Sequence, residues 1–162
     1  MSAVLQNPGV ERVRAALAAA GLDAEIVELP GAARTARAAA DFLGCEVAQI
    51  ANSLVFRARA SDAALLVLSS GARRVDLARL SEVVGESVDK ADADFVRART
   101  GFAIGGVAPV GHAGPLRSFV ERSLAACDPL WAAAGHPHTV FRLSYAELLR
   151  ISGATPIDAA SA

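Results

Sequence analysis

The sequence has almost no lysine: Lys90 is the only one among 162 residues, and all other Lys/Arg positions are arginine. The formal net charge is −1, which argues against a general nucleic-acid clamp because such domains are usually basic. The abundant alanine beside these arginines is typical of a biased genome composition. Clustered arginines can still bind phosphate through paired hydrogen bonds.

Long apolar runs are also missing. No stretch approaches the length of a transmembrane helix, and the N-terminus lacks the basic start and apolar core of a signal peptide. We therefore expect a cytoplasmic protein without a membrane partner. Cysteine is rare as well: Cys45 and Cys127 lack CxxC spacing, so we interpret them as isolated thiols without a redox or metal role.

The composition and length of the chain are typical of one globular domain. Hydrophobic residues make up 53% of the chain and charged residues 20%, a composition that excludes a disordered chain. The length fits one domain with one core. We predict a single domain over residues 1–162, with a frayed tail from about residue 154.

Helix signals recur along the chain as a capping residue before an apolar period and a glycine after it. Ser144 and Glu147 add the S-x-x-E pattern of a capping box. The expected N-terminal caps of the five helices are Asn7, Thr35, Asp76, Asp92 and Ser144.

Strand signals lie between these helices. Residues 52–60 and 63–70 read as two strands joined at Ser61-Asp62, which predicts a hairpin. Residues 24–29 and 138–144 read as single strands, and residues 116–126 favour a strand in their first half. Strands therefore occur both in hairpins and between helices, which predicts an α+β or mixed α/β domain.

Familiar catalytic and metal motifs are absent. "GHPH" holds His136 and His138, but it lacks helical i, i+4 spacing and a nearby carboxylate or cysteine set, so a loop is favoured over a metal site. "GGVAPVG" fails the spacing of a dinucleotide fingerprint, and there is no P-loop or G-x-S-x-G elbow. We expect no metal and no cofactor.

The stretch "TGFAIGGVAPVGH", residues 100–112, holds four glycines and ends on His112. Glycines such as Gly105 and Gly106 let backbone groups approach a ligand without an intervening side chain. Successive amides can bind an anion or the oxyanion of acyl transfer, and Pro109 would stiffen the loop. A plain turn between core strands fits the same residues.

Three blocks carry a resemblance to a known family. They are "TARAAADFLGCEVAQIANSLVFRA", "LSSGARRVDLARLSEVVGESVDKADADFVRARTGFAIGGVAPVGH" and "HTVFRLSYAELLRISGA". In this order and spacing they resemble the YbaK-like aminoacyl-tRNA editing domain, which is inserted in bacterial prolyl-tRNA synthetases and also occurs as free-standing proteins. The resemblance runs from about Thr35 to Gly153.

This resemblance implies an α+β fold in which helices surround a mixed, strongly curved sheet. It implies hydrolysis of the ester between a wrong amino acid and the terminal adenosine of a tRNA, without a cofactor. The family's G-x-x-x-P loop falls on Gly105 to Pro109, where its backbone would hold the aminoacyl end. The water would be aided by the ribose hydroxyl of the tRNA, so no protein nucleophile is required.

One departure from the family concerns Asn52. Many members carry a lysine just before the "S/T-L-V/L" strand, whereas this chain has asparagine in "IANSLVF". Asparagine can hydrogen-bond a substrate but brings no charge. Asn52 is therefore a candidate site residue with Gly105 and Gly106, although a polar residue that merely opens a strand is the alternative.

Further candidates follow from position. Thr35, Ser70 and Gly71 are candidates for substrate binding, as are Pro109 and His112. Thr35 would serve equally as a helix cap, Ser70 and Gly71 as a turn, and His112 as a structural histidine.

Arg73 and Arg74 form the strongest basic pair for acceptor-stem phosphates, and a solvated pair is the alternative. We expect a free-standing aminoacyl-tRNA deacylase that acts on a small wrong amino acid, with the tRNA acceptor end and a synthetase as partners. A binding module without hydrolysis, or a hydrolase of small acyl esters, are the alternatives.

Overall fold

The structure is a computed structural model that describes residues 2–161. Each predicted cap begins a helix: the side chains of Asn7, Thr35, Asp76, Asp92 and Ser144 accept backbone N–H groups of the first turn. The helices are α1 (Pro8–Ala19), α2 (Ala36–Leu43), α3 (Leu77–Val84), α4 (Ala93–Thr100) and α5 (Tyr145–Ser152), with short 3₁₀ helices η1 (Val47–Gln49) and η2 (Arg122–Ala126).

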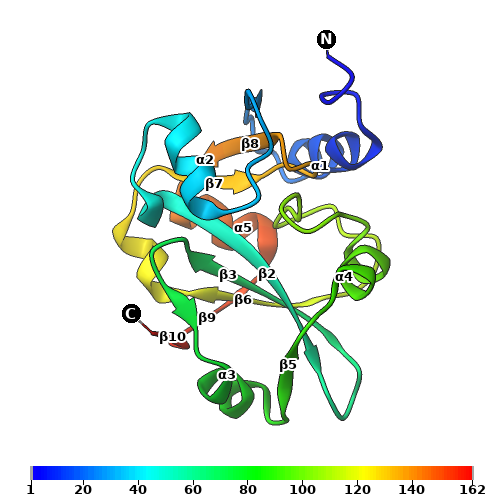
Figure 1. Cartoon of the computed structure of the whole chain (residues 1–162), viewed down its shortest axis with the longest axis vertical. Helices are drawn as coiled ribbons and strands as arrows, with labels where there is room; N and C mark the ends of the chain where they lie inside the picture. The colour runs from blue at the N-terminus through cyan, green and yellow to red at the C-terminus, as the bar shows by residue number, and fades with distance from the viewer. Residues whose placement is uncertain (1, 162) are drawn as a thin grey trace.

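A mixed sheet of eight strands forms the centre of the domain (Figure 1). Its order is β1-β8-β7-β2-β3-β6-β9, and β5 pairs with β2 beside this path. The strands are β1 (Ile26–Glu28), β2 (Ile50–Ala58), β3 (Ala64–Ser70), β5 (Val88–Lys90), β6 (Arg117–Glu121), β7 (Leu130–Ala133), β8 (Thr139–Leu143) and β9 (Thr155–Ile157). A separate pair joins β4 (Arg74–Val75) to β10 (Ala160–Ser161).

The long strand β2 has one edge that is only partly covered. Along the other edge it pairs with β3 from Ala51 to Arg57. On the open edge, β7 pairs only with Ile50 and Ala51, and β5 pairs only from Phe56 to Ala58. Residues 52–55 therefore have a strand neighbour on one side alone, which leaves backbone groups of this segment free for other partners.

Apolar residues fill both faces of the sheet. One cluster joins α1, α4 and α5 to the sheet and includes Val13, Val96 and Leu148. The other lies under α3 and includes Leu80 and Val67. These clusters confirm a single α+β domain with helices around a mixed sheet, and they hold β2 rigidly between them.

The predicted frayed tail is wrong. Strand β9 pairs in parallel with β6, and Ile157 and Ala159 are buried in the second cluster. The N–H of Ala159 also donates to the carboxylate of Glu121 at 2.7 Å. The short polar-looking tail is ordered because β6 offers it a strand edge, which is a contact distant in sequence.

Strand β7 also escaped the sequence analysis, because "LWAA" follows a proline and carries little β-branched character. The first half of residues 116–126 is strand β6 and the second half is η2, which agrees with the preference for a strand in the first half. Within residues 2–161, no helix is long and apolar enough to cross a membrane.

Candidate active site

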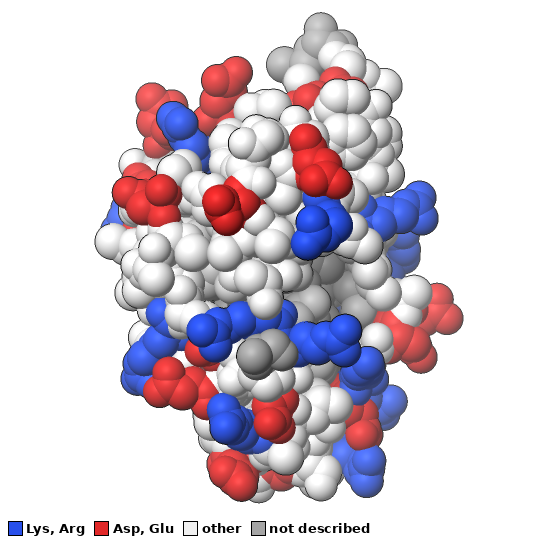
Figure 2. Space-filling model, turned by 60° about the vertical axis from the view of Figure 1, so that its left-hand side comes forward, with Lys and Arg blue, Asp and Glu red and all other residues white. Residues whose placement is uncertain are grey.

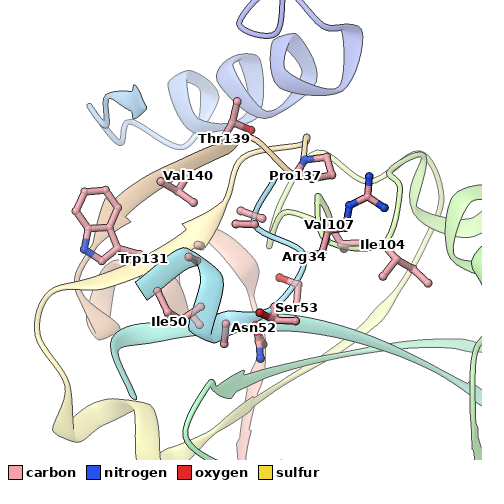
Figure 3. Close-up of a pocket in the computed structure, with 18 of the residues that line it drawn as sticks. Arg34, Ile50, Asn52, Ser53, Ile104, Val107, Trp131, Pro137, Thr139 and Val140 are labelled. Atoms are coloured by element: carbon pink, nitrogen blue, oxygen red, sulfur yellow. The ribbon is translucent and has the colours of Figure 1, made fainter. Parts of the chain in front are cut away.

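A cavity of about 160 Å³ lies at the open edge of β2. Its floor is formed by residues 52–54 of β2, and its sides by residues 33–36, residues 104–107 and the facing strands β7 and β8. Figure 3 shows Trp131 at one end, with Arg34 and Ile104 at the other. Alanine, isoleucine and valine side chains make most of the wall, so the cavity suits a small apolar group.

The glycine-rich stretch has two roles along its length. Val107, Ala108 and Val110 are buried in the core. The second half of the stretch therefore contributes to core packing. Ile104 is 55% exposed, and Gly105 lines the cavity with a φ of +89°. A positive φ explains the glycine, since other residues are strained there.

Three residues of the glycine-rich stretch line this side of the cavity: Ile104, Gly105 and Val107. Within residues 2–161, their backbone N–H groups donate to no acceptor. The N–H of Gly106, by contrast, donates to the carbonyl of Ala103 at 2.9 Å and closes a turn. The expectation that the backbone of Gly105 and Gly106 holds the substrate stays a prediction. Of these two residues, Gly105 is the one that lines the cavity and has an N–H without an acceptor within residues 2–161.

Gly106 is required for packing instead. A Cβ placed on it would lie 2.9 Å from the Cα of His136, closer than side-chain atoms approach backbone. Pro109 is buried and lies away from the cavity lining. Both residues therefore hold the loop in position rather than touch a ligand in the cavity.

His112 likewise packs away from the cavity. Its Nε2 lies 2.7 Å from the carbonyl of Ala108, and its ring meets Phe102 edge-on. Burial lowers the pKa of His112, opposed by the Ala108 carbonyl and reinforced by Arg12. This geometry corresponds to the structural alternative, in which a neutral imidazole fixes the end of the loop.

Asn52 and Ser53 both line the cavity but differ in direction. Neighbouring residues of a strand point to opposite faces, and Asn52 stands opposite Ser69 of β3. Within residues 2–161 the side-chain amide of Asn52 forms no hydrogen bond. It is available to a ligand that reaches the open edge of β2.

Ser53 is a site residue that the sequence analysis did not single out. Its Oγ is buried and has no hydrogen-bond partner within residues 2–161. In Figure 3 its side chain extends from β2 into the space beneath Arg34 and Val107. An unpaired buried hydroxyl costs stability, so a ligand group is the natural partner. Ser53 could not be identified from the sequence, because its position in the cavity depends on the open edge of β2.

The remaining predicted residues either support the wall of the cavity or lie on the surface of the protein. Thr35 lines the cavity, and its Oγ1 caps α2 by accepting the N–H of Ala38 at 3.1 Å. Ser70 donates to the carbonyl of Ala48 at 3.0 Å. A Cβ on Gly71 would lie 2.5 Å from that of Ala36. Ser70 and Gly71 therefore support the wall from outside the cavity.

Arg73 and Arg74 are exposed at the start of β4, outside the cavity lining. Arg74 pairs through its backbone with Ser161 of β10. Within residues 2–161 neither guanidinium forms an ion pair or a hydrogen bond. Their predicted contact with the acceptor stem stays a prediction, and they lie on a different element from the cavity.

The cavity lacks the groups of side-chain acid–base catalysis. Among the described residues that line it, none is Asp, Glu, His, Cys or Lys, and Arg34 is the one charged side chain. No group of three or more metal-ligating side chains occurs within residues 2–161. Burial raises the pKa of the Cys45 thiol beneath α2, which keeps it protonated. The polar groups that the lining residues carry are backbone groups, hydroxyls, the Asn52 amide and the Arg34 guanidinium.

Comparison with known proteins agrees with this architecture. The model of the aminoacyl-tRNA editing domain family matches residues 31–151. YwhH, an uncharacterised protein of Bacillus subtilis, is 27% identical over 128 residues, which cover 79% of this chain and 81% of that protein.

Two crystal structures are closely similar to the whole chain. One is a candidate trans-editing enzyme for prolyl-tRNA synthetase, with 41% identity, a TM-score of 0.89 and coverage of 96% of this chain and 99% of that one. The other, the hypothetical protein APE2540, is 25% identical with a TM-score of 0.86 and coverage of 93% and 99%. The chain belongs to the aminoacyl-tRNA editing domain family.

Proposed function

We propose that this protein is a trans-acting deacylase that hydrolyses the ester of a tRNA mischarged with a small amino acid. The observation that carries the proposal is the cavity at the open edge of β2. It combines a small apolar volume with the uncommitted amides of Gly105 and Val107. The family match and the similarity to a candidate trans-editing enzyme support the same activity.

The amides of Gly105 and Val107 would bind the carbonyl oxygen of the ester and stabilise its negative charge as water adds. Preorganised donors of this kind stabilise the transition state more than the ground state. The tetrahedral intermediate then collapses, the bond to the ribose oxygen breaks, and the products are the free amino acid and the 3′ end of the tRNA.

Proton transfer would fall to the substrate. Because no acid or base lines the cavity, the 2′-hydroxyl of the terminal ribose would orient the water and relay its proton to the leaving 3′-oxygen. The family resemblance implies this help from the substrate. Ser53 would hold the aminoacyl group through a neutral hydrogen bond, and Asn52 would hydrogen-bond the part of the substrate that reaches the open edge of β2. A volume of about 160 Å³ admits alanine, serine or threonine.

A second candidate function is a binding module that holds aminoacyl-tRNA or its synthetase without hydrolysis. Asn52 favours this candidate, because it leaves the cavity floor without the positive charge that many relatives place there. A deacylation assay against tRNAs charged with alanine, serine, threonine, cysteine and proline separates the two. A deacylase releases at least one of these amino acids faster than the uncatalysed hydrolysis in buffer. A binding module retains these tRNAs in a filter-binding assay and releases no amino acid.

The Asn52→Ala variant tests the cavity floor in the same assay. If the side-chain amide holds the substrate, the transition state loses about 1–2 kcal/mol. Because the amide has no partner within residues 2–161, thermal stability should change little. Unchanged kcat/KM for the tRNA hydrolysed fastest would mean that Asn52 only opens strand β2.

A further inference from the structure

A second hollow of about 620 Å³ lies next to the cavity. We call it the basic hollow; it lies between the first turns of α1, the end of α4, residues 101–103 and the β7–β8 connection at residues 135–138. Arg34 and Pro137 line both spaces. A ligand in the cavity can therefore continue past Arg34 into the basic hollow.

The lining of the basic hollow has one sign of charge. It includes Arg12, Arg34 and Arg97 with His136 and His138, and no aspartate or glutamate. Figure 2 shows a different face of the molecule, on which a band of basic side chains has acidic ones above, below and beside it. A concave, carboxylate-free surface with three guanidinium groups attracts anions.

Two of these arginines, Arg34 and Arg97, are unpaired. Six arginines elsewhere form ion pairs with Asp or Glu; these are Arg14, Arg57, Arg59, Arg79, Arg99 and Arg122. Arg34 and Arg97 are exposed, and within residues 2–161 they form neither an ion pair nor a hydrogen bond. Their donors are free for an external anion, and the planar guanidinium suits phosphate.

Arg12 supplies a fixed charge at the base of the hollow. Its Nη2 donates to the carbonyl of Gly101 at 2.7 Å and its Nε to that of Gly111 at 3.3 Å. Its guanidinium also lies 4.7 Å from the ring centre of Phe102. These contacts tie the charge to both ends of the glycine-rich loop, so Arg12 is preorganised.

The histidines offer aromatic faces at the same edge. The N–H of His138 donates to Nδ1 of His136 at 3.0 Å, which leaves Nε2 of the neutral His136 ring as a donor. The two rings meet edge-on with centres 5.2 Å apart. A nucleobase can stack on such rings while its phosphate contacts arginine.

We propose that the basic hollow binds the phosphodiester backbone of the 3′-terminal nucleotides of tRNA, with Arg34 and Arg97 as the phosphate ligands. The proposal rests on the function proposed above, because it extends the aminoacyl end held in the cavity along the strand. It assigns the phosphate contacts to α1, α4 and the segment before α2, rather than to Arg73 and Arg74. A free nucleotide phosphate has the same chemistry and is the alternative source.

Binding of an uncharged acceptor-stem minihelix ending in CCA, followed by fluorescence anisotropy across a salt series, tests this. Arg34→Gln and Arg97→Gln should each weaken binding at least about fivefold. Each should also reduce the slope of log Kd against log salt by about 0.7, the value for one single-strand phosphate. The control Arg122→Gln removes an exposed arginine paired with Asp158 and should leave both quantities unchanged.

Two further arms distinguish the alternatives. Removal of the terminal CCA from the minihelix should abolish the difference between wild type and Arg97→Gln, and free AMP should bind more weakly than the minihelix. Tighter binding of AMP, or loss of binding in Arg73→Gln and Arg74→Gln but not in the hollow variants, would overturn the proposal. If no mischarged tRNA is hydrolysed but minihelix binding still depends on Arg34 and Arg97, the deacylase proposal fails while the hollow stands.

Discussion

At the scale of single residues, Ser53 is a position where a group proposed to bind the substrate lowers the stability of the folded protein. Its hydroxyl is buried beside the cavity without a partner, a condition that weakens the folded state by itself. Removal of the hydroxyl should therefore separate stability from activity, which a residue of purely structural value does not do.

We predict that Ser53→Ala keeps or raises the free energy of unfolding, by up to about 1 kcal/mol, and lowers kcat/KM on mischarged tRNA about fivefold. Chemical denaturation and deacylation rates measure the two quantities. The matched control is Ser123→Ala, which removes another buried unpaired hydroxyl on η2, outside the cavity lining. Equal activity of the two variants would show that Ser53 does not meet the substrate.

At the scale of elements, the glycine-rich loop joins packing and chemistry in one segment. Its second half is anchored in the core through Val107 and Ala108, and Gly106 lies against the backbone of His136. The loop can therefore present the amide of Gly105 at a fixed place on the cavity rim, as an oxyanion site requires.

We predict that Gly105→Val lowers the deacylation rate by a factor of about 10²–10³, because a β-branched residue disfavours the φ of +89° and moves the amide. Gly85→Val is the matched control: Gly85 has a φ of +90° and open space around its Cβ position, at the end of α3. Both variants should lose similar stability, about 1–3 kcal/mol. Equal loss of activity in both would assign the effect to unfolding.

Strand β9 gives a test of the corrected C-terminal region. Ile157 is 5% exposed and lies in the cluster under α3. We predict that Ile157→Ala destabilises the protein by about 2–4 kcal/mol, measured by thermal or urea unfolding. A change in the free energy of unfolding below about 0.5 kcal/mol, as for an ordinary surface position, would support a frayed tail instead.

At the scale of the whole molecule, local signals in the sequence predicted the elements that depend on local physics. The caps at Asp76 and Ser144, and the hairpin between β2 and β3, follow from side chains adjacent in the chain. Strands β7 and β9 depend on partner strands that are distant in sequence. Their segments "LWAA" and "TPI" therefore carried no local signal that predicted a strand. The family resemblance supplied the overall architecture.

The candidate site shows the same limit. Gly105, Asn52 and Thr35 were found from motif position, and all three line the cavity. Ser53 and the amide of Val107 were missed because their importance depends on where β7 leaves β2. The turn bond from Gly106 to Ala103 could not be predicted from glycine spacing, and a contact of Gly106 with the substrate stays a prediction.

We propose that the protein hydrolyses an aminoacyl ester with backbone amides and the substrate's own hydroxyl, without a side-chain base. The most direct measurement compares deacylation of two alanyl-tRNAs acylated on the 3′-hydroxyl, one with a normal terminal adenosine and one with 2′-deoxyadenosine. Both should bind equally, and the deoxy substrate should react at least about a hundredfold more slowly, the contribution of a lost general base. Equal rates would contradict the claim, since they would require a proton acceptor on the protein that the cavity does not contain.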